Sequence, residues 1–345
     1  MEKERFYAVI HGVPKVELHL HLDDFIVEQQ EGKQGYDGLP SMLEEYRAAM
    51  FSRKGIEDFE RVFSRLARYM VRNGIVYAEV YFAIARYLTN GFLYKDMIEY
   101  FEKCIKKIHK QDGLEIRMIA DLSRSYGVKS AENVLTQVLA HRSKYVVAVG
   151  LGGDESKGKA KDYVELFKKA KEHGLRTHSH AGEFDDYQSV IDTVELLKAE
   201  RIGHAVSAGQ SDATIKLLAD RKIPVEILLT SNVLTKHYVT KVEDHPAKLF
   251  WNRGVFITLS TDDPNLFKTS LLKEYWLMHN KLGLSMNDIY CVIINGFRAS
   301  FMPESRKRAY IRLVNKKWNR RFTLTERMKH KGWQDACKDV FDNVE

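Results

Sequence analysis

The chain has 345 residues and a hydrophobic content of 44%, which suffices for a sizeable buried core and excludes an intrinsically disordered protein. No apolar run approaches the roughly 20 residues that a membrane-spanning helix needs, and residues 1–13 lack the apolar stretch of a secretory signal. We therefore expect a cytoplasmic location and no membrane partner.

The first strongly apolar run, residues 16–22, contains two histidines that alternate with leucines, and it predicts a β-strand. His19 and His21 are two residues apart, and residues with this spacing point to the same face of a strand. The two imidazoles are therefore placed to bind one metal ion, which would compensate for burying two polar groups. A pair of hydrogen-bonded core or surface histidines is the alternative, because two ligands alone do not make a metal site.

Seven further strand-like runs follow, with helical patterns between them. The predicted strands are 76–83, 115–122, 146–151, 176–180, 201–206, 224–230 and 255–261. The predicted helices are 55–73, 95–110, 131–141, 162–173, 187–199, 212–219 and 245–252. This alternation predicts an α/β protein with a (β/α)₈ TIM-type barrel. No linker divides the chain, so we expect one domain, 1–345, with the barrel core at about 14–268 and additional C-terminal helices at about 269–345.

The C-terminal region contains further helical patterns at 270–282, 286–301 and 304–321. A capping-box spacing at 323–326 predicts one more helix, to about residue 340. Segment 306–321 is the most basic part of a chain whose net charge is +7. Its apolar residues recur every three or four positions, which predicts an amphipathic helix with a solvated basic face. Attraction to phosphate groups is the alternative, but we expect no obligate nucleic-acid partner; the sequence gives no indication of oligomeric state.

Residues of metal-binding type occur at the ends of several predicted strands. His180 ends the fifth strand, His204 the sixth and Asp262 the eighth, in addition to His19 and His21 in the first. In a (β/α)₈ barrel the functional groups gather at the carboxyl ends of the strands. We therefore expect all five side chains at one mouth of the barrel.

The segments around these residues resemble motifs of the adenosine deaminase family of metal-dependent hydrolases. The matching segments are PKVELHLHLD (14–23), HAGE (180–183), RIGH (201–204), TSN (230–232) and TDDP (261–264). They occur in the family's order along the chain. Three positions in two segments depart from the family pattern. Asp24 and Phe25 replace a usual Gly-Ser pair, and Ala205 replaces a usual glycine.

The resemblance implies a hydrolytic deaminase with one Zn²⁺ per chain. Its ligands would be three imidazoles and one carboxylate, a donor set that suits zinc and makes water more acidic: His19, His21, His180 and Asp262. The implied catalytic residues are Glu183, His204 and Asp262. His204 and Asp262 would orient the water and take its proton, and a neutral Glu183 would protonate the purine ring. We expect His178 to be a hydrogen-bonded core residue and not a further ligand.

The resemblance also implies substrate contacts, from His21, Asp23, Phe59, Phe63, Gly153 and Asp263. The Gly153 backbone and the Asp263 side chain would contact the purine, and the two phenylalanines would form a helical lid. Asp23 would bind the ribose 5′-hydroxyl and repel a 5′-phosphate, with no basic residue beside it. If the strand continues, Asp24 faces away from the pocket. The alternatives are a turn at Gly153, a loop cap at Asp263 and core packing of the phenylalanines.

The expected partner is a small-molecule purine nucleoside. We expect conversion of adenosine or 2′-deoxyadenosine to inosine or 2′-deoxyinosine and ammonia. The second hypothesis is deamination of another 6-aminopurine, such as adenine, N6-methyl-AMP or an aminodeoxyfutalosine-like nucleoside. The third is a non-catalytic binding protein on the same scaffold, which would meet polyanions through its basic helix.

Overall fold

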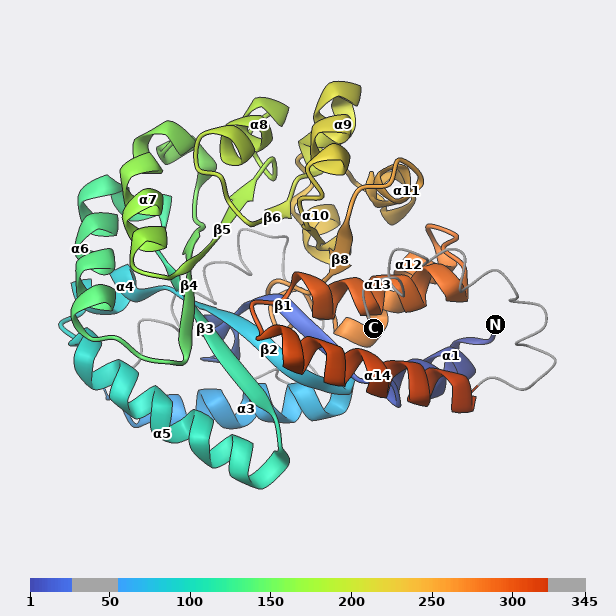
Figure 1. Ribbon diagram of the computed structural model, residues 1–345, viewed down its shortest axis with the longest axis horizontal. Helices are drawn as coiled ribbons and strands as arrows, with labels where there is room; N and C mark the ends of the chain where they lie inside the picture. Colours follow the sequence, from blue (N-terminus) through green and yellow to red (C-terminus); the bar gives the residue numbers. More distant parts are fainter. Residues whose placement is uncertain (27–54, 322–345) are drawn as a thin grey trace.

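The computed structural model describes residues 1–26 and 55–321, and its centre is a sheet of eight parallel strands surrounded by helices (Figure 1). Each strand pairs with the next along the chain. The strands are β1 (Lys15–His21), β2 (Ile75–Phe82), β3 (Glu115–Asp121), β4 (Val146–Leu151), β5 (Arg176–Ala181), β6 (Arg201–His204), β7 (Val225–Ile227) and β8 (Ile257–Leu259). This arrangement is a nearly closed (β/α)₈ barrel, so the predicted fold class is confirmed.

The last strand meets the first through a short closing seam, formed by residues 260–262 and 18–21. A parallel bridge joins Leu20 to Asp262. The Asp262 N–H donates to the His19 carbonyl at 3.1 Å, and the His21 N–H donates to the Asp262 carbonyl at 3.1 Å. The Ser260 hydroxyl accepts the His19 N–H at 3.2 Å. Asp262 is therefore part of the backbone contact that brings the two ends of the sheet together.

Helices between the strands cover the outside of the barrel. They are α3 (Asp58–Asn73), α5 (Tyr94–Asp112), α6 (Gly127–Ala140), α7 (Val164–Glu172), α8 (Tyr187–Glu195), α9 (Asp212–Asp220) and α11 (Ala247–Asn252). Their apolar faces point inward; in α3, for example, Val62, Leu66 and Met70 are fully buried. Gly74 ends α3 with a φ of 66°, and a Cβ at this position would lie 2.3 Å from a backbone oxygen. Only glycine fits this tight return to β2.

Three helices were not predicted: α1 (Lys3–His11), α4 (Ile84–Thr89) and α10 (Leu229–Thr235). The predicted seventh strand, 224–230, is too long, because β7 ends at Ile227 and α10 begins two residues later. A short apolar run does not distinguish a buried strand from the first turn of a helix. The predicted sixth and eighth strands also extend beyond the observed ends of β6 and β8.

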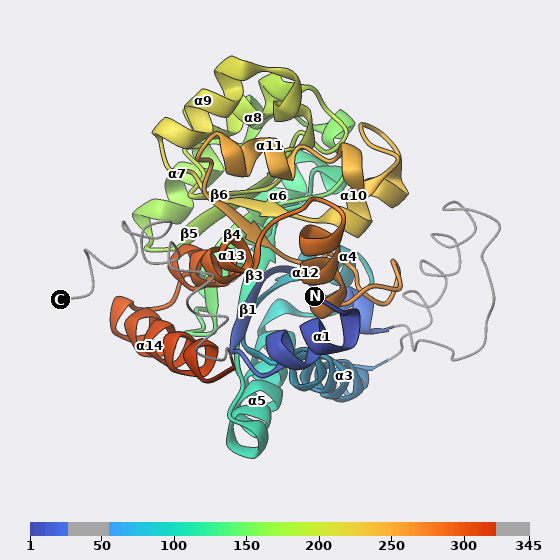
Figure 2. The same ribbon diagram turned by 90° about the vertical axis from the view of Figure 1, so that its right-hand side faces the viewer.

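Three helices follow the barrel: α12 (Leu271–Asn280), α13 (Met286–Ala299) and α14 (Glu304–Arg321). Helix α13 packs on β1 and β8, and α14 lies against α13 (Figure 1). Helix α1 packs against α12 (Figure 2). In α14, Ile311, Val314 and Trp318 are buried, as the amphipathic pattern predicts. The helix predicted after residue 322 lies outside the described residues. Within the described ranges, no helix is both long and apolar enough to cross a membrane.

A group of buried charges lies inside the barrel. The guanidinium of Arg201 pairs with Glu79 of β2 at 2.5 Å and with Glu226 of β7 at 2.7 Å, and all three side chains are fully buried. Arg201 also donates to the Ala299 carbonyl at 3.0 Å. Charges are costly to bury unless each has a partner. The first residue of the RIGH segment therefore neutralises two carboxylates in the barrel interior.

Replacement of Arg201 with methionine would leave Glu79 and Glu226 without their cation. We expect the Arg201→Met variant to lose about 3–5 kcal/mol of unfolding free energy, measured by denaturant titration. The matched control is Arg221→Met, which removes an exposed ion pair with Glu195 and should change stability by about 1 kcal/mol or less. Equal effects of the two changes would contradict this interpretation.

Candidate metal centre and active site

Four side chains from the ends of β1, β5 and β8 converge on one point. The Nε2 atoms of His19 and His180 lie 3.0 Å apart. Oδ1 of Asp262 lies 3.4 Å from His19 Nε2 and 3.1 Å from His21 Nε2. Ligand atoms bound at about 2.0–2.1 Å to one tetrahedral zinc ion lie about 3.3 Å apart. The donor atoms and their spacing therefore fit a single metal ion.

His204 lies close to the same point. His19, His180, His204 and Asp262 are all buried and can each place a ligand atom within 4.8 Å of the others. His21 forms an overlapping group with Asp262, and its side chain is 21% exposed. Burial lowers the pKa of His204 to about 3, so this imidazole is neutral. Proximity alone therefore allows either His21 or His204 as the fourth ligand.

The backbone around β6 explains how these groups come so close. A Cβ on Gly203 would lie 2.4 Å from His19 Cε1, so only glycine leaves room for the imidazole. His204 and Asp262 have φ values of 66° and 68°, in a region that most residues avoid. Ala205 also has a positive φ, 51°. The family's usual glycine suits this conformation, so the chain tolerates alanine here at the expense of backbone strain.

A carboxylate below the cluster orients His19. Glu226 Oε2 lies 2.7 Å from His19 Nδ1 and 2.6 Å from His178 Nε2. Burial opposes the charge on Glu226, but His178 and Arg201 hold its pKa well below the usual value. His19 therefore donates its Nδ1 proton to Glu226 and turns its Nε2 lone pair toward the cluster. His178 is hydrogen-bonded at both nitrogens, to Glu226 and to Tyr81, as expected for a core residue.

Asp262 is held in place from both sides. Its Oδ1 faces the imidazoles, and its Oδ2 accepts the Ser231 hydroxyl at 2.7 Å. Burial raises the pKa of Asp262, but the neighbouring imidazoles of His19 and His21 together outweigh this and bring the pKa well below its ordinary value. The carboxylate is thus ionised and available to a cation.

Glu183 lies in the loop after β5, with Oε2 at 3.4 Å from His204 Nε2. Burial and the charges of Asp262 and Glu155 raise the pKa of Glu183 well above its usual value. A carboxyl group with a raised pKa retains its proton to a higher pH and can donate it to a bound molecule. The site thus places the candidate ligand Asp262, whose pKa is lowered, near a carboxyl group whose pKa is raised.

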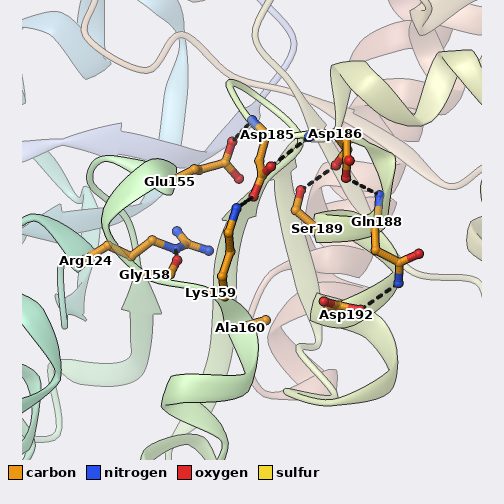
Figure 3. Close-up of a pocket in the computed structure, with 10 residues that line it drawn as sticks. All are labelled: Arg124, Glu155, Gly158, Lys159, Ala160, Asp185, Asp186, Gln188, Ser189 and Asp192. Carbon is orange, nitrogen blue, oxygen red and sulfur yellow. Dashed lines mark hydrogen bonds and ion pairs between the residues drawn. The ribbon is translucent and has the colours of Figure 1, made fainter.

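The loop that carries Glu183 is held by Glu155, which is almost completely buried. Glu155 Oε1 accepts the Gly182 N–H at 2.9 Å. Its Oε2 accepts the N–H groups of Glu183, Phe184 and Asp185 at 3.0, 2.7 and 2.9 Å. Four backbone donors on one carboxylate fix the path of the loop. Figure 3 shows Glu155 beside Asp185.

A pocket borders this loop (Figure 3). Its lining is mostly charged and polar: Arg124, Glu155, Gly158, Lys159, Ala160, Asp185, Asp186, Gln188, Ser189 and Asp192. Arg124 donates to the Leu151 and His180 carbonyls, both at 2.9 Å, and so joins the ends of β4 and β5. The lining of this pocket includes none of the candidate metal ligands.

Asp23 lies next to the cluster in a 3₁₀ turn, η1 (Leu22–Ile26), and not in a continued strand. It accepts the Tyr87 hydroxyl and, at 3.3 Å, the Ala83 N–H. The expectation that no basic residue lies beside Asp23 is wrong, because Arg86 of α4 interacts electrostatically with it. Burial lowers the pKa of Arg86, but the charge of Asp23 together with Tyr126 and Tyr87 brings the pKa above its ordinary value.

Asp24 and Phe25, which depart from the family pattern, have structural partners. Asp24 is buried, and its carboxylate accepts the N–H groups of Asn265 and Leu266 at 2.7 and 2.9 Å. Phe25 is buried against Tyr69, with ring centroids 5.5 Å apart. Asp24 thus anchors the loop after β8, and neither side chain needs to enter a substrate pocket.

Phe59 and Phe63 lie in a buried aromatic cluster. Phe101 packs edge-on against both, with centroid distances of 4.7 and 5.2 Å. Phe59 also packs against Tyr87, the residue that donates to Asp23. The geometry matches ordinary core packing that supports the Asp23 side of the site. Contact of the two phenylalanines with a substrate stays a prediction.

Gly153 and Asp263 lie at the mouth of the barrel. Gly153 is exposed with a φ of 79°, and a Cβ there would lie 2.7 Å from the hydroxyls of Ser123 and Ser125. Burial and the charge of Asp262 raise the pKa of Asp263 to about 7. Their contacts with a purine also stay predictions.

Several residues that shape the site were missed by the sequence analysis: Asp121, Glu155, Glu226, Ser231 and Asn232. Asp121 ends β3 and accepts the N–H groups of Gly152 and Ser123 at 2.8 and 3.1 Å. Two of the missed residues leave a signal in the sequence. Asp121 is a carboxylate at the end of a predicted strand, and Glu226 is a carboxylate within the apolar run that forms β7. The TSN segment was found as a motif, but it gave no roles for its side chains.

Comparisons with known proteins agree with this geometry. A family model described as Adenosine deaminase matches residues 26–317. A protein of Clostridium perfringens (strain 13 / Type A) named Adenosine deaminase is 30% identical over 320 residues, covering 86% of this chain and 96% of that protein.

Three solved structures share the fold. An adenine deaminase from Arthrobacter aurescens has a TM-score of 0.81 and 22% identity, covering 89% of this chain and 99% of that one. An amidohydrolase from Burkholderia ambifaria with bound Zn has a TM-score of 0.82 and 20% identity, with coverages of 93% and 94%. The N6-methyl-AMP deaminase from Arabidopsis thaliana has a TM-score of 0.77 and 22% identity, with coverages of 91% and 98%.

Removal of the His21 imidazole tests the ligand set. We expect the wild-type protein to bind one divalent ion per chain and His21→Ala to lose it, because three remaining ligands bind more weakly. The measurement is metal content after dialysis, by atomic absorption. The matched control is His173→Ala, which changes an exposed histidine outside the cluster and should retain the metal. Full metal content in His21→Ala would point instead to His204 as the fourth ligand.

Proposed function

The chain belongs to the adenosine deaminase family, and we propose that it hydrolyses the 6-amino group of adenosine or 2′-deoxyadenosine, with inosine or 2′-deoxyinosine and ammonia as products. The observation that carries this proposal is the pairing of the metal-binding cluster with Glu183. Three imidazoles and an ionised carboxylate lie beside a carboxyl group whose surroundings raise its pKa and so favour its protonated form. Hydrolysis of an aminopurine needs both features in one site.

The metal in this proposal is one Zn²⁺ per chain, held by His19, His21, His180 and Asp262. The donor set is nitrogen-rich with one carboxylate, a combination that suits zinc. When bound, zinc lowers the pKa of water so that hydroxide is available near neutral pH. Asp262 is placed to accept a proton at the cluster, because Ser231 and the imidazoles hold its carboxylate ionised.

Glu183 supplies the proton in the opposite direction. Addition of hydroxide to the amino-bearing carbon places electron density on the neighbouring ring nitrogen. Protonation of that nitrogen by Glu183 neutralises this charge and allows ammonia to leave. Glu155 supports the step by fixing the loop that positions the Glu183 carboxyl.

The proposed substrate contacts extend outward from the cluster. Gly153 and Asp263 would meet the purine, Asp23 the ribose and Phe59 and Phe63 the side of the pocket. His21 is the most exposed of the ligands and borders the space that a substrate would enter. The location that we infer is the cytoplasm, and this stays a prediction.

A second candidate is deamination of another 6-aminopurine, and the proximity of Arg86 to Asp23 favours it. A cation beside the ribose end would attract the phosphate of a nucleotide. A panel of adenosine, 2′-deoxyadenosine, adenine, AMP and N6-methyl-AMP, assayed for loss of the 6-amino chromophore, separates the candidates. Fastest turnover of a nucleoside supports the first function. Absence of turnover with every purine of the panel would support the hypothesis of a non-catalytic binding protein.

The acid role of Glu183 predicts a pH dependence. The protonated form is the active one, so turnover should fall as pH rises through the raised pKa of Glu183. Glu183→Gln removes the proton and should lower kcat by about 10²–10⁴-fold, while retaining the metal. This variant should also lose the decline at high pH. The control Glu165→Gln changes a carboxyl in the first turn of α7 and should behave as wild type. Near-normal turnover in the Glu183→Gln variant would reduce Glu183 to a structural role.

The charge of Asp23 predicts discrimination against nucleotides. Adenosine should be deaminated about 10²-fold faster than AMP, because the Asp23 carboxylate repels a 5′-phosphate; this ratio equals about 2.8 kcal/mol. Asp23→Ala should slow the nucleoside and narrow the gap to AMP in steady-state assays. The control Asp96→Ala changes an exposed carboxylate of α5. A wild-type preference for AMP would contradict the role given to Asp23 and direct attention to Arg86.

A further inference from the structure

A chain of hydrogen bonds runs from the active site to the backbone of α11. The Asn232 side-chain amide lies 2.8 Å from His204 Nδ1, through its Nδ2 atom. Its Oδ1 lies 3.1 Å from His245 Nε2. His245 Nδ1 in turn accepts the Ala247 backbone N–H at 3.1 Å. His204, Asn232 and His245 are each at least 97% buried, so water does not compete for these contacts.

The direction of every bond in this chain follows from its far end. A backbone N–H can only donate, so His245 Nδ1 must be an acceptor. Burial lowers the pKa of His245 to about 3, so its ring is neutral and carries its single proton on Nε2. That proton is donated to Asn232 Oδ1, which leaves the amide NH₂ to face His204. A flipped Asn232 amide would present a donor to His245 Nε2 and leave that N–H without an acceptor.

We propose that Asn232 and His245 are positioning residues that hold His204 with its proton on Nε2, so that His204 donates a hydrogen bond into the active site. Because His204 Nδ1 accepts the Asn232 NH₂, the proton of the neutral ring lies on the nitrogen that faces the cluster. This inference rests on the proposed function for its catalytic meaning, although the tautomer itself does not depend on it.

The tautomer decides between two assignments that distance alone leaves open. A nitrogen that carries a proton has no lone pair for a metal, so His204 is not a ligand, and His21 completes the set. The same proton prevents His204 Nε2 from accepting one from water, which was the role expected from sequence. Of His204 and Asp262, only Asp262 can then take the proton from water.

The surroundings of His204 Nε2 are consistent with an N–H donor that would bind an acceptor on a ligand. This atom is buried and has no hydrogen-bond partner among residues 1–26 and 55–321. The Glu183 carboxyl lies 3.4 Å away, and the Asp262 carboxylate lies in the same cluster. An N–H at this position would donate a hydrogen bond to the oxygen that adds to the purine. This bond would stabilise the negative charge that the oxygen carries.

The first experiment measures the tautomer of His204 without changing Asn232 or His245. Zinc-loaded protein with ¹⁵N-labelled histidine is studied by long-range ¹H–¹⁵N correlation NMR, and the His204 signals are assigned by their loss in His204→Gln. We expect the pattern of an Nε2–H imidazole for His204 and also for His245. A proton on His204 Nδ1 would overturn the proposal, whether or not the protein deaminates any purine.

The second experiment reverses the direction of the hydrogen bond between residue 232 and His204 Nδ1. In Asn232→Asp the new carboxylate can only accept, so it should draw the His204 proton to Nδ1. We expect the NMR pattern to switch and kcat to fall about 10–100-fold, the usual range for partners that orient a site residue, with a smaller change in KM. His245→Gln retains a donor toward Asn232 and should keep most activity, whereas His245→Leu should not.

The matched control is Asn73→Asp, which places a carboxylate at another buried amide, one that contacts Tyr69 and Leu272. This variant should leave the His204 signals and kcat unchanged, and circular dichroism checks the folding of each protein. Retention of both the wild-type tautomer and wild-type kcat in Asn232→Asp would overturn the proposal. Loss of kcat with an unchanged tautomer would also overturn it, because the effect would then be structural. Absence of purine turnover in wild type would refute the proposed function alone.

Discussion

Glu226 connects the interior of the barrel to its chemistry. One of its oxygens contacts both His19 and His178, and the other pairs with Arg201. Arg201 in turn neutralises Glu79, so the charge balance of β1, β2, β5, β6 and β7 depends on one buried arrangement. A carboxylate here can orient His19, a candidate ligand, because a guanidinium keeps it ionised where both side chains are fully buried. The strands must therefore assemble correctly before the cluster above them has a defined geometry.

Strained backbone occurs at the ends of the strands that carry the candidate site. His204, Ala205 and Asp262 have positive φ values, while the loop that carries Glu183 is held by four N–H groups on Glu155. Strain of this kind persists only where neighbouring contacts over-determine the conformation. Buried polar side chains such as Glu155 supply those contacts. This accounts for the buried carboxylates at the carboxyl ends of the strands. The result is a set of side chains whose orientations are fixed before any ligand arrives.

The sequence was sufficient for the barrel and for the cluster, because both follow from local regularities. Alternating apolar runs predict strands, and histidines with a spacing of two share a face; His19 and His21 both lie within 3.4 Å of Asp262 Oδ1. Helix α10 was not predicted, because Leu229 continues an apolar run and only three-dimensional packing ends β7 at Ile227. The partners of His204 were not predicted either. Asn232 and His245 are 13 residues apart, and no periodicity relates them. Asp24 illustrates a third limit, since its role depends on backbone groups of the distant loop at Asn265.

Asp262 gives its N–H and carbonyl to the closing seam and its carboxylate to the cluster. The strands on the C-terminal side of the barrel are short, with three residues each in β7 and β8. A cation shared by His19 and Asp262 would cross-link the first and last strands of the sheet. Its occupancy would then contribute to folding by mass action, about 2.7 kcal/mol at a free concentration 100 times the Kd. A chelator would thus act on this protein as a mild denaturant as well as an inhibitor.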